Sequence, residues 1–310
     1  MKVDLLGRAE FAWGIGPLKV RQPAASSRHP GFLYHEGDMK VDLHSHTTCS
    51  DGRNSPEELA RLARKAGIDV LAVTDHDTLD GIAPAAREGK KIGLRVVPGL
   101  EMSSQFEGRD VHVLGIGVDP SHRALRAQLA TMRRARKARV RKICAALATA
   151  GLDLDPEDVL AEAGGKSVGR KHVARAMVKR GLVPNDGVAF EKYLGEGGPA
   201  HVRSTEISPA QAASFIRKAG GQPVLAHPHF FGDDALVRRL LDSAPFAGIE
   251  AHHRFERPRK YLAYVAIARE RNLIVTGGSD FHGDDHPHNA GVGEFLTPPD
   301  QWARLERRLS

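Results

Sequence analysis

Residues 69–77 read DVLAVTDHD, a short apolar run that ends in two aspartates and a histidine. An apolar run of this length bounded by polar residues predicts a strand that is buried on both faces. A helix is predicted just before it, where Ser55 and Glu58 have the spacing of a capping box. Pro56 suits the first turn of that helix and Gly67 its end. Together they form one helix–strand unit of an α/β protein.

The same alternation runs along most of the chain. Strands are predicted over residues 40–46, 94–104, 110–119, 222–229, 248–253 and 273–283. Helices are predicted over residues 79–90, 208–221, 235–244 and 258–272. Repeated strand–helix units of this length predict a parallel sheet, either open or closed into a barrel.

The alternation breaks between residues 121 and 200. Residues 123–151 have apolar side chains at helical spacing, and further helices are predicted over 155–163 and 170–181. We therefore expect a helical insertion over 121–200 within a main domain formed by 39–120 and 201–310. The first 38 residues include the loop-like stretch RQPAASSRHPG, and they are expected to form a poorly ordered extension without a catalytic role.

Composition narrows the class of protein. The chain has 310 residues, 41% of them hydrophobic, and a net charge of +7. Two cysteines indicate no disulfide framework and fit a reducing cytosol, so a cytoplasmic location is expected. No apolar run is long enough for a transmembrane helix. Positive charges without acidic residues over 123–142 fit either a solvated helix face or a phosphate-attracting wall, and the sequence leaves both open.

Imidazoles and carboxylates follow the ends of six predicted strands. The carboxyl ends of parallel strands meet at one rim, where these groups would be costly to bury without partners. A metal centre satisfies them together, and nine candidates exceed the ligands of one ion. Asp75 and Asp77 are expected to orient neighbours instead of binding metal. The nine candidates are His44, His46, Asp51, His76, Glu101, His112, His227, Asp280 and His282.

Six motifs occur in the order found in the PHP (polymerase and histidinol phosphatase) superfamily, which the chain resembles over about residues 40–296. They are DLHSHTTCSDG, VTDHDT, GLEMSS, VHVLG, LAHPH and GGSDFHG. The resemblance implies a distorted (β/α)7 barrel with two or three divalent ions, Mn²⁺ first and Zn²⁺ or Fe²⁺ as alternatives. The ligand sets that it implies are His44, His46, Glu101 and Asp280 for one ion, Glu101, His112 and His227 for a second, and Asp51, His76 and His282 for a third.

The expected reaction is hydrolysis of a phosphate ester by a metal-bound hydroxide. GRKHVARAMVKRG and EKYLGEGGPAHVR resemble the insertion of the branch that dephosphorylates 3′,5′-bisphosphonucleotides and trims RNA from its 5′ end. Arg170, Lys171 and Arg203 are therefore predicted to bind the phosphate that is not cleaved. His229 and His253 are predicted to contact substrate or protonate the leaving group, with a role beside the ligands as the alternative.

Two other functions stay open at this point. One is a monoesterase resembling histidinol phosphatase, and the other is a non-catalytic nucleic-acid-binding module. The expected partner is a small phosphorylated substrate such as a nucleotide or short RNA, without a membrane or an obligate protein partner.

Overall fold

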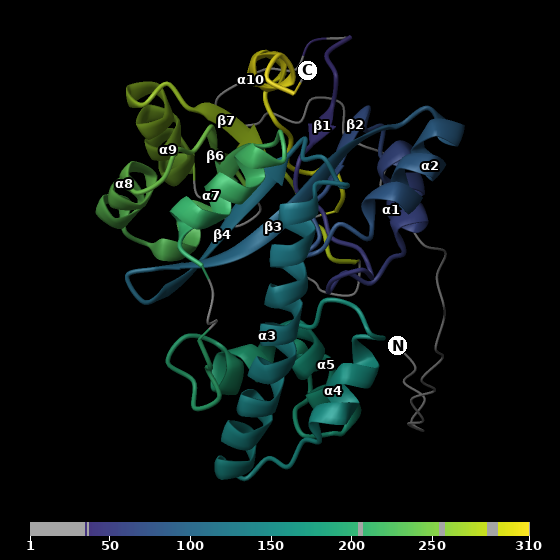
Figure 1. Ribbon diagram of the computed structural model, residues 1–310, viewed down its shortest axis with the longest axis vertical. Helices are drawn as coiled ribbons and strands as arrows, with labels where there is room; N and C mark the ends of the chain where they lie inside the picture. Colours follow the sequence, from purple (N-terminus) through teal and green to yellow (C-terminus); the bar gives the residue numbers. More distant parts are fainter. Residues whose placement is uncertain (1–34, 36, 204–206, 254–257, 284–290, 310) are drawn as a thin grey trace, which may run out of the picture.

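The computed structural model describes residues 35, 37–203, 207–253, 258–283 and 291–309 (Figure 1). The extension expected over residues 1–38 lies almost entirely outside the described residues.

Seven strands form one sheet in which each strand lies beside the next along the chain. The strands are β1 (Val41–Asp42), β2 (Val70–Val73), β3 (Arg95–Phe106), β4 (Arg109–Ile116), β5 (Gln222–Leu225), β6 (Gly248–His252) and β7 (Ile274–Gly277). The segments that follow β1 and β7 also meet, since the amide of His46 donates to the carbonyl of Phe281 (2.9 Å) and the amide of Asp280 to that of His44 (2.8 Å). The sheet is therefore a nearly closed barrel, which confirms the predicted distorted (β/α)7 fold.

Strand β4 runs antiparallel to both β3 and β5, so the expectation of a wholly parallel sheet is wrong here. Only Glu107 and Gly108 separate β3 from β4, and both have positive φ, 47° and 75°. Positive φ at both central residues is the geometry of a tight hairpin, whereas a parallel connection needs a dozen or more residues. His112 consequently reaches the rim from within an antiparallel strand and pairs with Ser103 in the register.

Six helices of the described chain pack around this sheet, with α1 and α2 on one side and α7, α8 and α9 on the other (Figure 1). They are α1 (Pro56–Lys65), α2 (Ile82–Ile92), α7 (Pro209–Lys218), α8 (Asp234–Asp242), α9 (Pro258–Glu270) and α10 (Pro299–Glu306). The capping box of α1 is confirmed: the amide of Glu58 donates to Ser55 Oγ (3.2 Å) and that of Ser55 to Glu58 Oε2 (2.7 Å). Trp302 of α10 packs among the barrel's interior residues.

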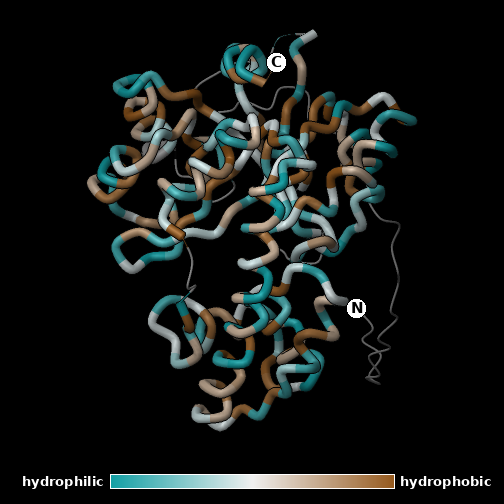
Figure 2. Tube along the Cα trace, viewed as in Figure 1, coloured by the Kyte–Doolittle hydropathy of each residue, from teal (hydrophilic) through white to brown (hydrophobic). Residues whose placement is uncertain are grey.

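The predicted helical segment lies between β4 and α7, at the end of the molecule away from α10 (Figure 1). It comprises α3 (Arg123–Thr149), α4 (Pro156–Glu162), α5 (Arg170–Lys179), α6 (Asp186–Ala189) and a π-helical turn, η1 (Phe190–Leu194). Figure 2 shows hydrophobic segments in this part as well as in the barrel. No helix in the described part of the chain is both long and apolar enough to cross a membrane.

Helix α3 belongs to two hydrophobic cores. Leu125 and Met132 pack with the barrel core, whereas Ile143 and Leu147 pack with α4 and α5 in a second core. The insertion was expected to begin at residue 121, but the first half of α3, which begins just after it, packs on the barrel. This shared helix fixes where the insertion sits relative to the barrel rim, and the functional side chains gather at that junction.

Candidate metal centre and substrate cavity

Glu101 lies at the middle of the histidine cluster. It is on β3, just beyond the carboxyl end of β2, and is fully buried. Although burial alone would raise it, the surrounding imidazoles hold the pKa of Glu101 well below its usual value. Its carboxylate oxygens contact nitrogens of His44 (3.4 Å), His46 (3.3 Å), His76 (2.9 Å), His112 (2.8 Å) and His227 (3.0 Å). One carboxylate among five imidazoles is an arrangement suited to bridging two cations.

Donor atoms of His44, His46, Glu101 and Asp280 lie close together. The Nε2 atoms of His44 and His46 lie 3.1 Å apart, and they lie 3.4 and 3.2 Å from Oδ1 of Asp280. Both imidazoles are also within 3.4 Å of Glu101 Oε2. Tetrahedral ligands at metal–donor distances of 2.0–2.1 Å are about 3.3–3.4 Å from one another, and the distances from these two imidazoles to the two carboxylates are close to that value.

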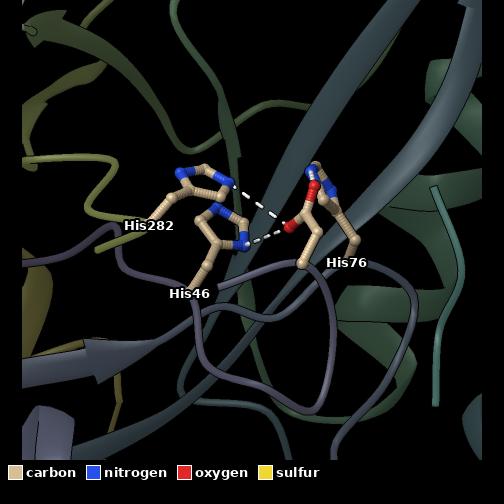
Figure 3. Close-up of side chains that lie close together, drawn as sticks. His46, His76 and His282 are labelled. Carbon is tan, nitrogen blue, oxygen red and sulfur yellow. Dashed lines mark ion pairs between the residues drawn. The ribbon is translucent and has the colours of Figure 1, made fainter. Parts of the chain in front are cut away.

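A second group of donors surrounds Asp51. Its carboxylate lies 3.3 Å from Nε2 of His282 and 3.9 Å from Nε2 of His76. Figure 3 shows His46, His76 and His282 turned toward a shared space. Within the described chain, Oδ1 of Asp51 and Nε2 of His282 are buried, and apart from their 3.3 Å contact with each other neither has a hydrogen-bond partner. Buried polar atoms left in this way are costly, and a bound cation would satisfy them.

The local backbone explains how His44 and His46 reach the same point. Alternate residues of an extended strand share a face, and both imidazoles follow β1. Gly278 packs directly on His44, where an added Cβ would lie only 2.5 Å from the His44 amide nitrogen. His227 and Asp280 have positive φ values of 29° and 49°, which non-glycine residues rarely adopt. Strain of this kind costs on the order of 1–3 kcal/mol per residue and is typical of functional sites.

The structure therefore brings all nine predicted ligands into one cluster. Within it, groups of three or four side chains have ligand atoms close enough together to hold one metal ion. One group is His46, Asp51, His76 and His282. Another is His76, Glu101 and His112. The assignment of each residue to a particular ion stays a prediction.

Sequence analysis missed Glu250, which holds His44 from behind. Its carboxylate lies 3.0 Å from Nδ1 of His44 and accepts the amide of His227 at 2.8 Å. An acceptor at Nδ1 fixes the ring so that Nε2 faces the cluster. Burial opposes the charge on Glu250, but the neighbouring His44 keeps its pKa below the usual value. An acidic residue inside the apolar run GIEAHH was the available signal, because a buried carboxylate needs a partner.

Arg136 of α3 was also missed as a site residue. Its guanidinium donates to Asp77 Oδ2 (2.6 Å), to Ser103 Oγ (2.7 Å) and to the carbonyl of Val168 (3.1 Å). Asp77 also accepts the amide of Ser103 at 2.8 Å. Asp75 instead accepts from Thr47, with 2.6 Å between Thr47 Oγ1 and Asp75 Oδ2. Of the two aspartates beside His76, Asp77 thus joins β3 to α3, and Asp75 holds the loop after β1.

A cavity of about 450 Å³ opens over the cluster, between the barrel rim and the insertion. This volume suits a small organic ligand. Asp51, Glu101 and Asp280 line one part of it, and Arg170 and Lys171 line another. The predicted substrate residues Arg170 and Lys171 therefore face the same space as the candidate ligands.

The other predicted contact residues do not line this cavity. Arg203 is exposed and does not line the cavity; its guanidinium lies beside Gly108, which does. His253 is fully buried, with Nε2 3.4 Å from Oδ2 of Asp280. The ring of His229 lies 4.7 Å from that of His253. Neither histidine lines the cavity, and a catalytic role for them stays a prediction.

The basic helix α3 combines the two alternatives left open by the sequence, a phosphate-attracting wall and a solvated face. Arg136 and Arg139 line the cavity, whereas other basic residues of the helix, such as Arg134, face solvent. Arg139 and Arg170 share the carboxylate of Asp110, at 3.3 and 3.4 Å. Despite its burial, these arginines keep the pKa of Asp110 below its usual value. Asp110 thus holds the two guanidinium groups together on one wall of the cavity.

Charges along the cavity balance before any metal is counted. Its lining includes five carboxylates and five basic side chains. The carboxylates are Asp51, Glu101, Asp110, Glu196 and Asp280, and the basic residues are Arg109, Arg136, Arg139, Arg170 and Lys171. Attraction for an anionic substrate would therefore depend on added cations.

Comparison with known proteins gives a consistent picture. A profile of the PHP domain matches residues 42–153. The chain is 36% identical over 247 residues to a 5′–3′ exoribonuclease of Haemophilus influenzae, covering 78% of this chain and 90% of that one. It is 32% identical over 282 residues to a 3′,5′-nucleoside bisphosphate phosphatase of Chromobacterium violaceum, covering 87% and 97%. A solved Bifidobacterium adolescentis protein of the metal-dependent phosphoesterase class superposes with a TM-score of 0.79 at 30% identity, covering 87% and 96%.

Proposed function

The chain belongs to the PHP family of metal-dependent phosphoesterases, and we propose that it acts on small nucleotides with more than one phosphate or on the 5′ ends of short RNA. One observation carries this proposal: the ligand cluster and the basic pair Arg170 and Lys171 line the same cavity. A phosphate held at the cluster would leave a second phosphate within reach of the basic wall.

Two or three divalent ions are proposed to bind the nine clustered donors, with Mn²⁺ as the first choice. The donor set is entirely nitrogen and oxygen, which suits Mn²⁺, Zn²⁺ and Fe²⁺. His44, His46, Glu101 and Asp280 would hold one ion. Glu101 would bridge to a second ion with His112 and His227. Asp51, His76 and His282 would hold a third. When bound, such ions lower the pKa of water and offset the negative charge of a phosphoryl group.

Other residues of the chain orient the ligands and bind the substrate in this proposal. Glu250 orients His44, and His253 lies beside Asp280, so we propose that His253 positions that carboxylate. Arg170 presents a planar guanidinium that can bind two phosphate oxygens at once. Asp110 would keep that guanidinium in place until substrate arrives.

The wall of basic residues distinguishes this proposal from a monoesterase resembling histidinol phosphatase. A substrate with a single phosphate leaves Arg170 and Lys171 without a second anion, so a bisphosphate should be preferred. A non-catalytic nucleic-acid-binding module is disfavoured because all nine predicted ligands are clustered. Location in the cytoplasm stays a prediction from the cysteine content.

The test is phosphate release by the Mn²⁺-loaded protein from adenosine 3′,5′-bisphosphate and from histidinol phosphate. Preferential release from the bisphosphate is expected. Asp280→Ala should abolish release with the fold retained, and Arg170→Met should lower kcat/KM for the bisphosphate by about 10- to 100-fold, as expected for a charge-assisted hydrogen bond. Leu262→Ala, at an exposed position that does not line the cavity, is the control. RNA binding without phosphate release would favour the non-catalytic function.

A further inference from the structure

A large aromatic side chain stands exposed at the cavity. Phe230 is 54% exposed, although phenylalanine is usually buried, and it lines the cavity over the cluster of candidate ligands. Its ring centroid lies 5.0 Å from that of His227, one of the candidate ligands. A single exposed apolar residue is unremarkable elsewhere on a surface, but here it adjoins the site of chemistry.

The backbone around Phe230 is held firmly. It lies on η2, a short 3-10 helix (Pro228–Phe231) between His227 and Gly232. The amide of Phe230 donates to the carbonyl of His227 (3.2 Å), and Arg109 donates to the carbonyl of Phe231 (3.3 Å). The ring of Phe231 is buried in the barrel core. Because its neighbour Phe231 is buried, the side chain of Phe230 is directed away from the core and into the cavity lining.

Three imidazole rings, those of His227, His229 and His253, lie within 5.9 Å of this phenyl ring. The ring of His229 lies 4.3 Å from it at an interplanar angle of 43°. More than half of the phenyl surface still faces solvent. An aromatic side chain that lines a cavity and is 54% exposed offers accessible ring surface on which a flat ring can stack.

The chemistry of the remaining cavity identifies the flat ring. With cations bound, the ligand cluster and the wall of Arg139, Arg170 and Lys171 would hold anionic phosphates. A molecule that combines phosphates with a planar aromatic group one sugar away is a nucleotide. We propose that Phe230 stacks on the base of the nucleotide whose phosphate is cleaved, and so determines selectivity for base-bearing substrates over sugar phosphates; this inference rests on the proposed phosphoesterase function.

Stacking on any base should be tolerated, because every base has a π-face. The platform therefore separates nucleotides from other phosphate esters without selecting one base. Phe190 lines the same cavity from the insertion and offers a second apolar surface there.

The experiment compares kcat/KM for adenosine 3′,5′-bisphosphate with that for the abasic analogue 1-deoxyribose 3,5-bisphosphate. The wild-type protein should prefer the base-bearing substrate by roughly 5- to 150-fold, the range typical of one base stacked on an aromatic ring. Phe230→Ala should reduce this ratio toward one, and Phe230→Trp should retain it. Leu262→Ala, which removes a similarly exposed apolar side chain far from the cavity lining, should leave the ratio unchanged.

Each outcome has a defined meaning. An unchanged ratio in Phe230→Ala, or equal losses on both substrates, would overturn the stacking role and leave the phosphoesterase intact. A ratio that falls as far in Phe230→Trp as in Phe230→Ala would also overturn it. If the wild-type protein released phosphate from neither substrate, the proposed function would fall, and the stacking role with it. Elemental analysis of each variant shows whether a change in metal content accounts for any loss.

Discussion

Replacing Arg136 by methionine should destabilise the folded protein by about 3–5 kcal/mol, the usual cost of removing one partner of a buried ion pair. The Arg136 side chain is only 9% exposed, and its Nε lies 2.6 Å from Asp77 Oδ2. Burial opposes the charge of the guanidinium, but Asp77 holds the pKa of Arg136 above its usual value. Methionine keeps much of the volume of the arginine side chain but removes its charge and all three of its hydrogen bonds.

Most of the lost stability in Arg136→Met should come from Asp77 and not from the other two partners of Arg136. Ser103 Oγ and the carbonyl of Val168 are neutral and would each lose one hydrogen bond, whereas Asp77 would keep a buried negative charge with the amide of Ser103 but no cation beside it. Neutralising that charge should recover part of the stability. The double variant Asp77→Asn/Arg136→Met should therefore be more stable than Arg136→Met by about 0.5–3 kcal/mol.

Urea unfolding followed by far-ultraviolet circular dichroism measures these differences. Arg134→Met is the matched control on the same helix, since Arg134 is exposed and should change stability by no more than about 0.5 kcal/mol. A loss below about 1 kcal/mol in Arg136→Met would refute the reasoning. So would a double variant that is no more stable than Arg136→Met, because the uncompensated Asp77 charge would then not be the cause.

Three further predictions concern the site, the pH dependence and a helix end. Glu101→Gln should lower the bound metal content and reduce turnover by more than about 100-fold, because a neutral amide is a poor bridge between cations; elemental analysis showing the full wild-type content would contradict this. Burial lowers the pKa of His172 to about 4, and its Nδ1 accepts the amide of Gly169. The unfolded chain therefore takes up a proton first, so stability is full above about pH 6.5 and falls by roughly 3 kcal/mol toward pH 4. His172→Gln should flatten that part of the pH profile of unfolding, and an unaltered profile would exclude His172 as its source. Ser55→Ala removes the cap that accepts from Glu58 and should lower stability by about 0.5–2 kcal/mol in thermal unfolding, whereas no change would mean that the capping box contributes little.

Local sequence patterns were sufficient for most elements. The capping-box residues Ser55 and Glu58, and likewise Ser208 and Gln211, mark helix starts because the hydrogen bonds involved span only three residues. Runs such as VLAV mark buried strands because every side chain is apolar. Candidate ligands could be found in the same way, since imidazoles and carboxylates at strand ends are uncommon without a shared partner.

The antiparallel direction of β4 could have been found from the sequence but was not. Two residues between two strands leave no room for a crossover, whatever the strands contain. Glu107–Gly108 is a weaker hairpin signal than Asn-Gly or Asp-Gly, and this allowed the general alternation to dominate the prediction. Whether a strand runs parallel or antiparallel to the one before it depends on the length of the connection between them, and the residues within the strand do not indicate its direction.

By itself the sequence determined which segments form helices and strands and which side chains can ligate metal, because those properties depend on neighbours along the chain. Only the tertiary structure decided that Glu250 lies behind His44, that Arg136 reaches Asp77 and that Asp110 joins Arg139 to Arg170. These partners are separated by 29 to 206 residues. Their contacts follow from the closure of the barrel and the position of α3 over its rim, and no local pattern encodes either.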